Sequence, residues 1–213
     1  MSDIIYSYVI ANNCDFAPCY DNNLWSLACC KPRIRRSVFK NGFSDDGTPY
    51  NNIWVVGVKH TKDKIGSKIE YIAKVTKVLR LEEYYNDNSP YSDRKDCIYR
   101  NFSSSDCPVD LKDETNPAKY IKNHMIKQPC AHTFKNSNKP TSTEINVFNK
   151  DINGKCVLLS DFFCRFEGDG KHFEKLDFIY KKCEAKRPGD FFYCQGNVEI
   201  DDLEKIVNKY REV

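Results

Sequence analysis

Residues 28–37 read ACCKPRIRRS and place two adjacent cysteines next to a run of cations. Five cations and no acidic residue lie between positions 28 and 42. Three kinds of chemistry use such residues: a thiolate that positive charge activates, a metal site with thiolate ligands, and a surface that binds phosphate. Each of them makes a different demand on the rest of the chain.

A metal site requires the most specific pattern of residues. Structural zinc needs four ligands, which short Cys-x₂₋₄-Cys pairs usually supply. The spacings in this chain are Cys14-x₄-Cys19, the adjacent Cys29 and Cys30, and Cys130-x-His132. None of these is a standard zinc knuckle, so neither a metal nor another cofactor is expected. One thiol of the adjacent pair is expected to pack inside the protein, because neighbouring side chains leave a strand or helix in different directions.

Cys30 is the candidate for a nucleophilic thiol. A thiolate beside Lys31 and close to the start of a helix has a lowered pKa. A mechanism of this kind also needs a base, and the candidate His132 lies far away in the sequence. The residues therefore permit catalysis by Cys30 but do not require it.

The basic run also suits phosphate. Pro32 fits the first turn of a helix, whose N-terminus attracts anions, and arginine side chains match the geometry of phosphate. If Ile34 faces inward, Arg33 and Arg35 lie on its flanks, each about 100° around the helix, with their heads at the rim. Lys31 then points more toward a pocket than either arginine. The alternative is a solvated basic face that pairs with carboxylates, and both interpretations stay open.

Elements with clear patterns must position these residues. Strands are predicted at 4–10, 53–58 and 69–78, a short helix at 33–38, an exposed loop at 41–52, a helical turn at 81–85 and an amphipathic helix at 199–213. The pair Asn153-Gly154 predicts a hairpin that joins residues 145–151 to a strand at 156–163. Between 86 and 116 only Cys97-Ile98-Tyr99 is expected to be structured.

Composition sets wider limits. The 213 residues carry a net charge of +3 and are 40% hydrophobic, which fits a folded protein whose bulk charge requires no anionic partner. No secretion signal and no run of eighteen apolar residues is present, so no membrane span is expected. The eleven cysteines are expected to be reduced thiols in an intracellular, cytoplasmic protein.

Several stretches together resemble one known family, nucleotide modification associated domain 2. They are Tyr6-Ser7-Tyr8-Val9-Ile10, Asp15-Phe16-Ala17-Pro18, Cys30-Lys31-Pro32-Arg33-Ile34-Arg35, Trp54-Val55-Val56-Gly57, the segment 73–78 leading to Glu83-Tyr84, the residues Asp96, Ile98 and Tyr99, and Val157-Leu158-Leu159-Ser160-x-Phe162. The resemblance covers most of the chain. It implies a role in systems that make or handle modified nucleotides.

The order of the predicted strands is also similar to that of the PUA-like group of small barrels. We therefore expect an α+β protein, with a single domain over residues 1–213 built on a small mixed or barrel-like β-sheet with flanking helices. Its N-terminal motif region spans 4–85, and its C-terminal strands and helix span 145–213. In such a barrel the basic run lies beside the mouth of a pocket.

Three functions are compatible with this sequence and the expected fold. The first is a module that binds a nucleotide or a modified base in DNA or RNA, through Tyr8, Phe16, Lys31, Arg33, Arg35, Trp54, Asp96, Tyr99 and Ser160. Phe16 or Trp54 stacks on the base, Asp96 or Ser160 hydrogen-bonds its edge, and the three cations contact phosphate. The second is a hydrolase or transferase acting on a modified base or nucleotide, with Lys31 and Asp96 as an acid–base pair assisted by Cys30 or His132. The third is an interaction protein, viral or defence-related, that occupies the site of a partner.

Overall fold

The strands form two sheets. The structure is a computed structural model that describes residues 2–10, 16–60, 65–100, 102, 141–184, 191–195 and 200–211. The first sheet contains β1 (Asp3–Ile10), β4 (Asn52–His60), β5 (Ile65–Lys74), β8 (Phe162–Arg165) and β9 (Phe191–Gln195), in the order β8-β5-β4-β1-β9. The second contains β2 (Cys19–Asp21), β3 (Leu24–Leu27), β6 (Lys77–Arg80) and β7 (Cys156–Ser160), in the order β2-β3-β7-β6. Only the β1–β4 pair is parallel among these strands.

The chain passes twice between the sheets over very short links. Residues 75–76 join β5 to β6, and Asp161 alone separates β7 from β8. The predicted strand at 69–78 is therefore two strands in different sheets, and the predicted strand at 156–163 is divided in the same way. The α+β class is confirmed. The closed, PUA-like barrel is not found, because the described strands form two open sheets.

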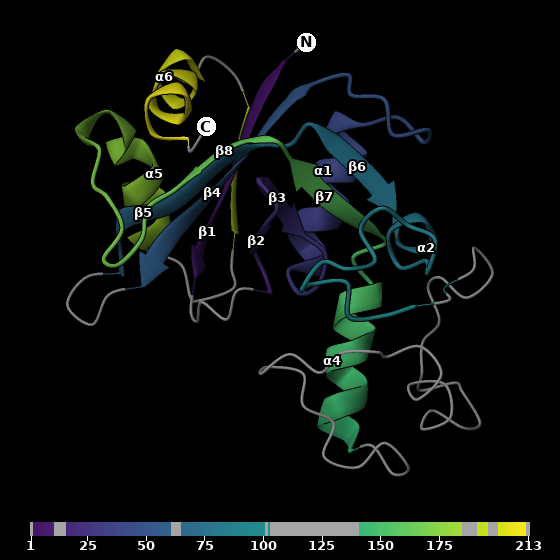
Figure 1. Cartoon of the computed structure of the whole chain (residues 1–213). Helices are drawn as coiled ribbons and strands as arrows, with labels where there is room; N and C mark the ends of the chain where they lie inside the picture. The colour runs from purple at the N-terminus through teal and green to yellow at the C-terminus, as the bar shows by residue number, and fades with distance from the viewer. Residues whose placement is uncertain are drawn as a thin grey trace.

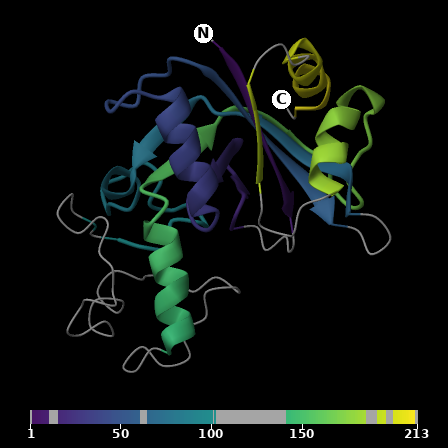
Figure 2. The ribbon, with the colours of Figure 1, turned by 180° about the vertical axis from the view of Figure 1, so that it is seen from behind.

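Helices pack against the faces of both sheets. They are α1 (Pro32–Gly42), α2 (Leu81–Tyr84), α4 (Ser142–Ile152), the 3-10 turn η1 (Glu174–Leu176), α5 (Asp177–Glu184) and α6 (Ile200–Tyr210). Figure 1 shows α5 and α6 together on one side of the first sheet, and α4 projecting at the other end of the molecule. From behind, α1 runs across the second sheet (Figure 2). The predicted helix starting at Pro32, the turn at 81–85 and the C-terminal helix are confirmed.

The buried side chains form three clusters that follow this layering. The central cluster lies between the sheets and α1, and it takes Ile4, Tyr6, Tyr8 and Ile10 from β1. Ile5 and Val9 point the other way, into the cluster beneath α5 and α6. The third cluster lies against α2 and α4 and includes Cys97, Ile98, Tyr99 and Phe102. β1 is thus buried on both faces, which explains its nearly continuous apolar sequence.

The predicted hairpin before β7 is wrong, because residues 142–152 form helix α4. The Thr141 side chain accepts a hydrogen bond from the amide of Glu144, whose carboxylate accepts one from the amide of Thr141. This reciprocal capping box fixes the start of a helix. Phe148 and Ile152 are then four residues apart on its buried face. The Asn153-Gly154 pair follows the end of this helix instead of turning a hairpin.

Two further expectations concern the chain as a whole. No helix in the described ranges is long and apolar enough to cross a membrane. The cysteines whose side chains the structure describes are thiols and not disulfides, namely Cys19, Cys29, Cys30, Cys97, Cys156, Cys164 and Cys183.

Candidate functional site

The basic run begins with a left-handed turn. Cys30 and Lys31 have φ angles of 58° and 45°. Lys31 is the N-cap of α1, and Pro32 occupies the first turn of the helix. A left-handed conformation costs about 1–2 kcal/mol for each residue that carries a Cβ. Two such residues in succession persist only where interactions with surrounding residues hold this backbone conformation.

Charged side chains supply that support on both sides of Cys30. The amide N–H of Cys30 donates to Asp151 Oδ1 at 2.6 Å, and its carbonyl oxygen accepts from Arg35 Nε at 2.9 Å. Asp151 is buried on the last turn of α4, where its other oxygen accepts the Tyr99 hydroxyl at 2.7 Å. The turn before α1 is thereby tied to an element more than a hundred residues away.

Arg35 is a structural residue. Its guanidinium also donates to the carbonyl oxygens of Cys156, at 2.7 Å, and Asp151. A Cβ on Gly154 would overlap this guanidinium, so the glycine leaves the space that the group fills. The expectation that the Arg35 head lies at the rim is wrong, because the end of α4 and β7 cover that flank of α1. Arg33 lies exposed as expected.

Lys31 lies over a buried tyrosine. Its ammonium is 4.7 Å from the centre of the Tyr8 ring, a cation–π distance. The side chain is half-buried, and burial lowers the pKa of Lys31 below its ordinary value, although the nearby Cys30 opposes this shift. Helix α1 has no side-chain cap and no acidic residue in its first turn. A desolvated cation therefore lies at the positive end of a helix dipole.

Tyr8 is held by its alignment with two residues on the adjacent strands. Tyr8 on β1 pairs with Gly57 on β4, which pairs with Tyr71 on β5. The Tyr71 ring passes over Gly57, and its hydroxyl donates to that of Tyr8 at 2.8 Å. Burial raises the pKa of both tyrosines, so both are neutral at pH 7. Gly57, the glycine of the Trp-Val-Val-Gly stretch, thus leaves room for the Tyr71 ring. Tyr71 in turn supports Tyr8 beneath Lys31.

Replacing Gly57 by alanine should show this relation. The added Cβ would overlap the Tyr71 ring and approach Ile10, so we expect a loss of about 1–3 kcal/mol in the free energy of unfolding. Denaturant titration measures this loss. In a double-mutant cycle, Tyr71→Ala should remove most of the extra cost of Gly57→Ala. Strictly additive losses would show that Gly57 does not accommodate the Tyr71 ring.

Several predicted ligand residues lie inside other parts of the protein. Trp54 is fully buried in the cluster beneath α5 and α6, with its ring 6.1 Å from that of Phe162. The Ser160 hydroxyl accepts from the amide of Phe162 at 3.1 Å and shapes the bend between β7 and β8. Tyr99 is fully buried, and its hydroxyl donates to Asp151, which in turn binds the Cys30 amide. The geometry gives none of these three a surface for a ligand.

Asp96 is also enclosed. It accepts the hydroxyls of Ser26, at 2.5 Å, and Tyr84, at 2.7 Å, and its carboxylate is 3.4 Å from Arg94 Nε. This cluster ties β3 to the segment after α2. The structure therefore does not bring Lys31 and Asp96 together as an acid–base pair. His132, the other distant candidate, lies outside the described residues.

Two predicted residues lie at or next to the Cys29–Lys31 turn. Phe16 is half-buried, and its carbonyl oxygen accepts a hydrogen bond from the Cys29 thiol at 3.3 Å. Cys30 is half-buried in the turn itself. Cys29 is fully buried, as expected for one thiol of the pair. The Cys30 thiol, burial and neighbouring Asp151 raise the pKa of Cys29, so it is a protonated core residue at pH 7. No group of three potential metal ligands gathers within the described ranges.

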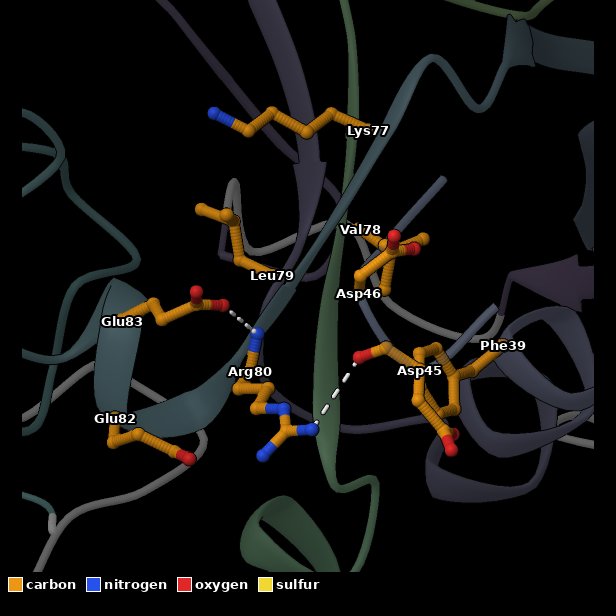
Figure 3. A pocket seen from close by; sticks show the side chains of 10 residues that line it. Phe39, Asp45, Asp46, Lys77, Val78, Leu79, Arg80, Glu82 and Glu83 are labelled. Atoms are coloured by element: carbon orange, nitrogen blue, oxygen red, sulfur yellow. Dashed lines mark hydrogen bonds between the residues drawn. The ribbon is translucent and has the colours of Figure 1, made fainter. Parts of the chain in front are cut away.

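Two hollows lie away from this turn. The first, of about 570 Å³, lies between α2, β6 and the loop after α1, and Figure 3 shows carboxylates around it. Asp46 there accepts hydrogen bonds from Ser44 and Thr48, which lower its pKa to about 2. The second, of about 420 Å³, is bordered by Tyr20, Phe163 and two arginines, and also by Asp21, Asp161 and Glu167. Lys77 and Arg80 also line the first hollow, but carboxylates outnumber cations in both linings, which disfavours phosphate.

Sequence patterns missed the residues that support Lys31. The Asn153-Gly154 signal places Asp151 in a hairpin strand, and only the capping box at Thr141 indicates the helix that carries it. Tyr71 was recognised as part of a strand, but its reach across Gly57 depends on the order of the sheet. The alternation of β5 could have placed Tyr71 and Ala73 on one face, as the structure does.

Comparison with protein families gave one match that spans nearly the whole chain. A family model described as nucleotide modification associated domain 2 matches residues 2–212. Searches of curated proteins and of solved structures gave no match.

Proposed function

The chain belongs to the nucleotide modification associated domain 2 family, and from this premise we propose that it binds a nucleotide, or a nucleotide unit of a nucleic acid, with phosphate at the start of helix α1. The family name indicates a context of nucleotide modification. The observation that carries the proposal is the position of Lys31, which is half-buried over Tyr8 at a helix N-terminus without a side-chain cap.

Physical chemistry favours an anion at this position. The amides of the first helical turn and the helix dipole attract negative charge, and a partly desolvated ammonium binds phosphate more strongly than one in water. Arg33 is exposed two residues after Lys31, in the first turn of α1, and it adds a second cation. Tyr8 is fully buried and supports Lys31 from below, so it does not stack on a base. The half-buried Phe16 is the side chain we assign to base contact.

Calorimetric titration at low salt tests the proposal. The four ribonucleoside monophosphates, the corresponding nucleosides and inorganic phosphate are titrated into the protein. We expect the monophosphates to bind, inorganic phosphate to bind more weakly, and the nucleosides to bind most weakly. Absence of binding by every monophosphate and by a short single-stranded oligonucleotide would overturn the proposal.

A second candidate is an enzyme that acts on a modified base or nucleotide. One observation favours it: burial lowers the pKa of Lys31, and a lysine whose pKa is lowered is better suited to proton transfer than one in water. Asp96 is not its partner, since it is bound to Ser26, Tyr84 and Arg94. Incubation with modified nucleosides and nucleotides, followed by mass spectrometry, decides this question. A mass change that requires Lys31 would establish an enzyme, whereas unchanged masses would leave binding alone.

A further inference from the structure

We propose that Asp151 is a positioning residue, which holds the Cys30 turn in its left-handed form and so places Lys31 at the ligand. This inference rests on the proposed function, because it concerns the same site. It assigns a role to a buried carboxylate that makes no direct contact with Lys31 through any hydrogen bond or ion pair described in the structure.

The contacts at Cys30 carry the argument. The direction of the Lys31 side chain depends on the backbone angles of Cys30 and Lys31, both in the left-handed region. Asp151 Oδ1 accepts the Cys30 amide at 2.6 Å, a short charge-assisted hydrogen bond. This bond fixes the entry to the turn. Arg35 fixes its exit through the Cys30 carbonyl oxygen.

Asp151 is itself held firmly. It is buried on the last turn of α4, its second oxygen accepts the Tyr99 hydroxyl, and its own carbonyl oxygen accepts from Arg35. Without the carboxylate, the strained turn loses its partner on one side and is free to relax to right-handed or extended angles. Lys31 would then leave the Tyr8 ring and enter water.

Three variants separate positioning from general stability. Asp151→Ala removes the acceptor for the Cys30 amide. Asp151→Asn keeps that acceptor, and its amide group can donate to the Tyr99 hydroxyl. Tyr99→Phe is the matched control, because it removes the other hydrogen bond of Asp151 and leaves the bond to Cys30 in place.

The first readout needs no ligand. The pKa of Lys31 is measured by NMR in lysine-labelled protein, with the signal assigned through Lys31→Arg. In the wild type this pKa should lie below the ordinary lysine value of about 10.4. It should rise toward that value in Asp151→Ala and stay near the wild-type value in Asp151→Asn and Tyr99→Phe. The groups described around the Lys31 ammonium are Tyr8, which stays neutral, and Cys30.

The second readout is the affinity for AMP. We expect at least a tenfold loss in Asp151→Ala and a change of less than about threefold in the other two variants, since each threefold change is about 0.65 kcal/mol. If the wild type binds no AMP, the proposed function is in doubt, but the pKa readout still tests the role of Asp151.

The inference is overturned if folded Asp151→Ala leaves the pKa of Lys31 unchanged, or if Tyr99→Phe shifts it equally. Should Asp151→Ala fail to fold, hydrogen exchange in the wild type decides instead. We expect the Cys30 amide to exchange slowly, as a buried carboxylate partner requires, and rapid exchange contradicts the inference.

Discussion

Replacing Lys31 by alanine is expected to lower the affinity for a nucleoside monophosphate by about 10- to 100-fold, which corresponds to the roughly 1.5–3 kcal/mol of a hydrogen bond to a charged group. The loss follows from the removal of the half-buried cation that, in the proposed site, meets the phosphate beside the positive end of the helix dipole. The free energy of unfolding should change by less than about 1 kcal/mol, since the cation–π contact with Tyr8 contributes little more than this and the cost of burying the ammonium disappears with it.

Lys40→Ala is the matched control. Lys40 is an exposed cation in the last turn of the same helix, so its removal changes the net charge equally but leaves the start of the helix intact. Calorimetry and thermal unfolding of both variants separate binding from folding. If Lys31→Ala unfolds the protein while the folded fraction still binds nucleotide, Lys31 is structural and the site lies elsewhere.

Replacing Arg35 by alanine is expected to have the largest effect on stability, a loss of about 3–5 kcal/mol in the free energy of unfolding. The guanidinium is fully buried and donates to three carbonyl oxygens, from Cys30, Asp151 and Cys156. Alanine leaves those oxygens without their donor and leaves a cavity beside Gly154.

The neighbouring arginine provides the control. Arg36 is exposed and donates to the Asn153 side chain, so Arg36→Ala should cost no more than about 0.5 kcal/mol. Gly154→Ala should also destabilise the protein, because its Cβ would displace the Arg35 guanidinium. Equal losses for Arg35→Ala and Arg36→Ala in denaturant titration would contradict the structural role of Arg35.

Local patterns predicted the elements whose signals lie within a few residues. Pro32 marked the start of α1, the alternation and β-branching of residues 4–10 marked β1, and helical spacing marked α6. These predictions needed only the geometry of a single strand or helix.

The errors arose where distant segments decide the environment. Arg35 lies on a flank of α1 that looks exposed from local spacing, and only the approach of α4 and β7 buries it. Trp54 and Tyr8 both lie in strands buried on two faces, so no alternation of polar residues shows which face each side chain occupies. The sequence suggests that Asp96 contacts a ligand because no local pattern shows its actual partners. These partners, Ser26, Tyr84 and Arg94, come from separate segments.

The salt dependence of nucleotide binding tests the central claim most directly. The affinity of the wild type and of Lys31→Ala for a short single-stranded oligonucleotide is measured over a range of salt concentrations. We expect the wild-type affinity to fall steeply with salt, and the slope of log K against log salt to be shallower in Lys31→Ala by about 0.7, the value for one phosphate contact to a single strand. Equal slopes for the two proteins, or no binding by the wild type at low salt, would contradict the assignment of phosphate to the start of helix α1.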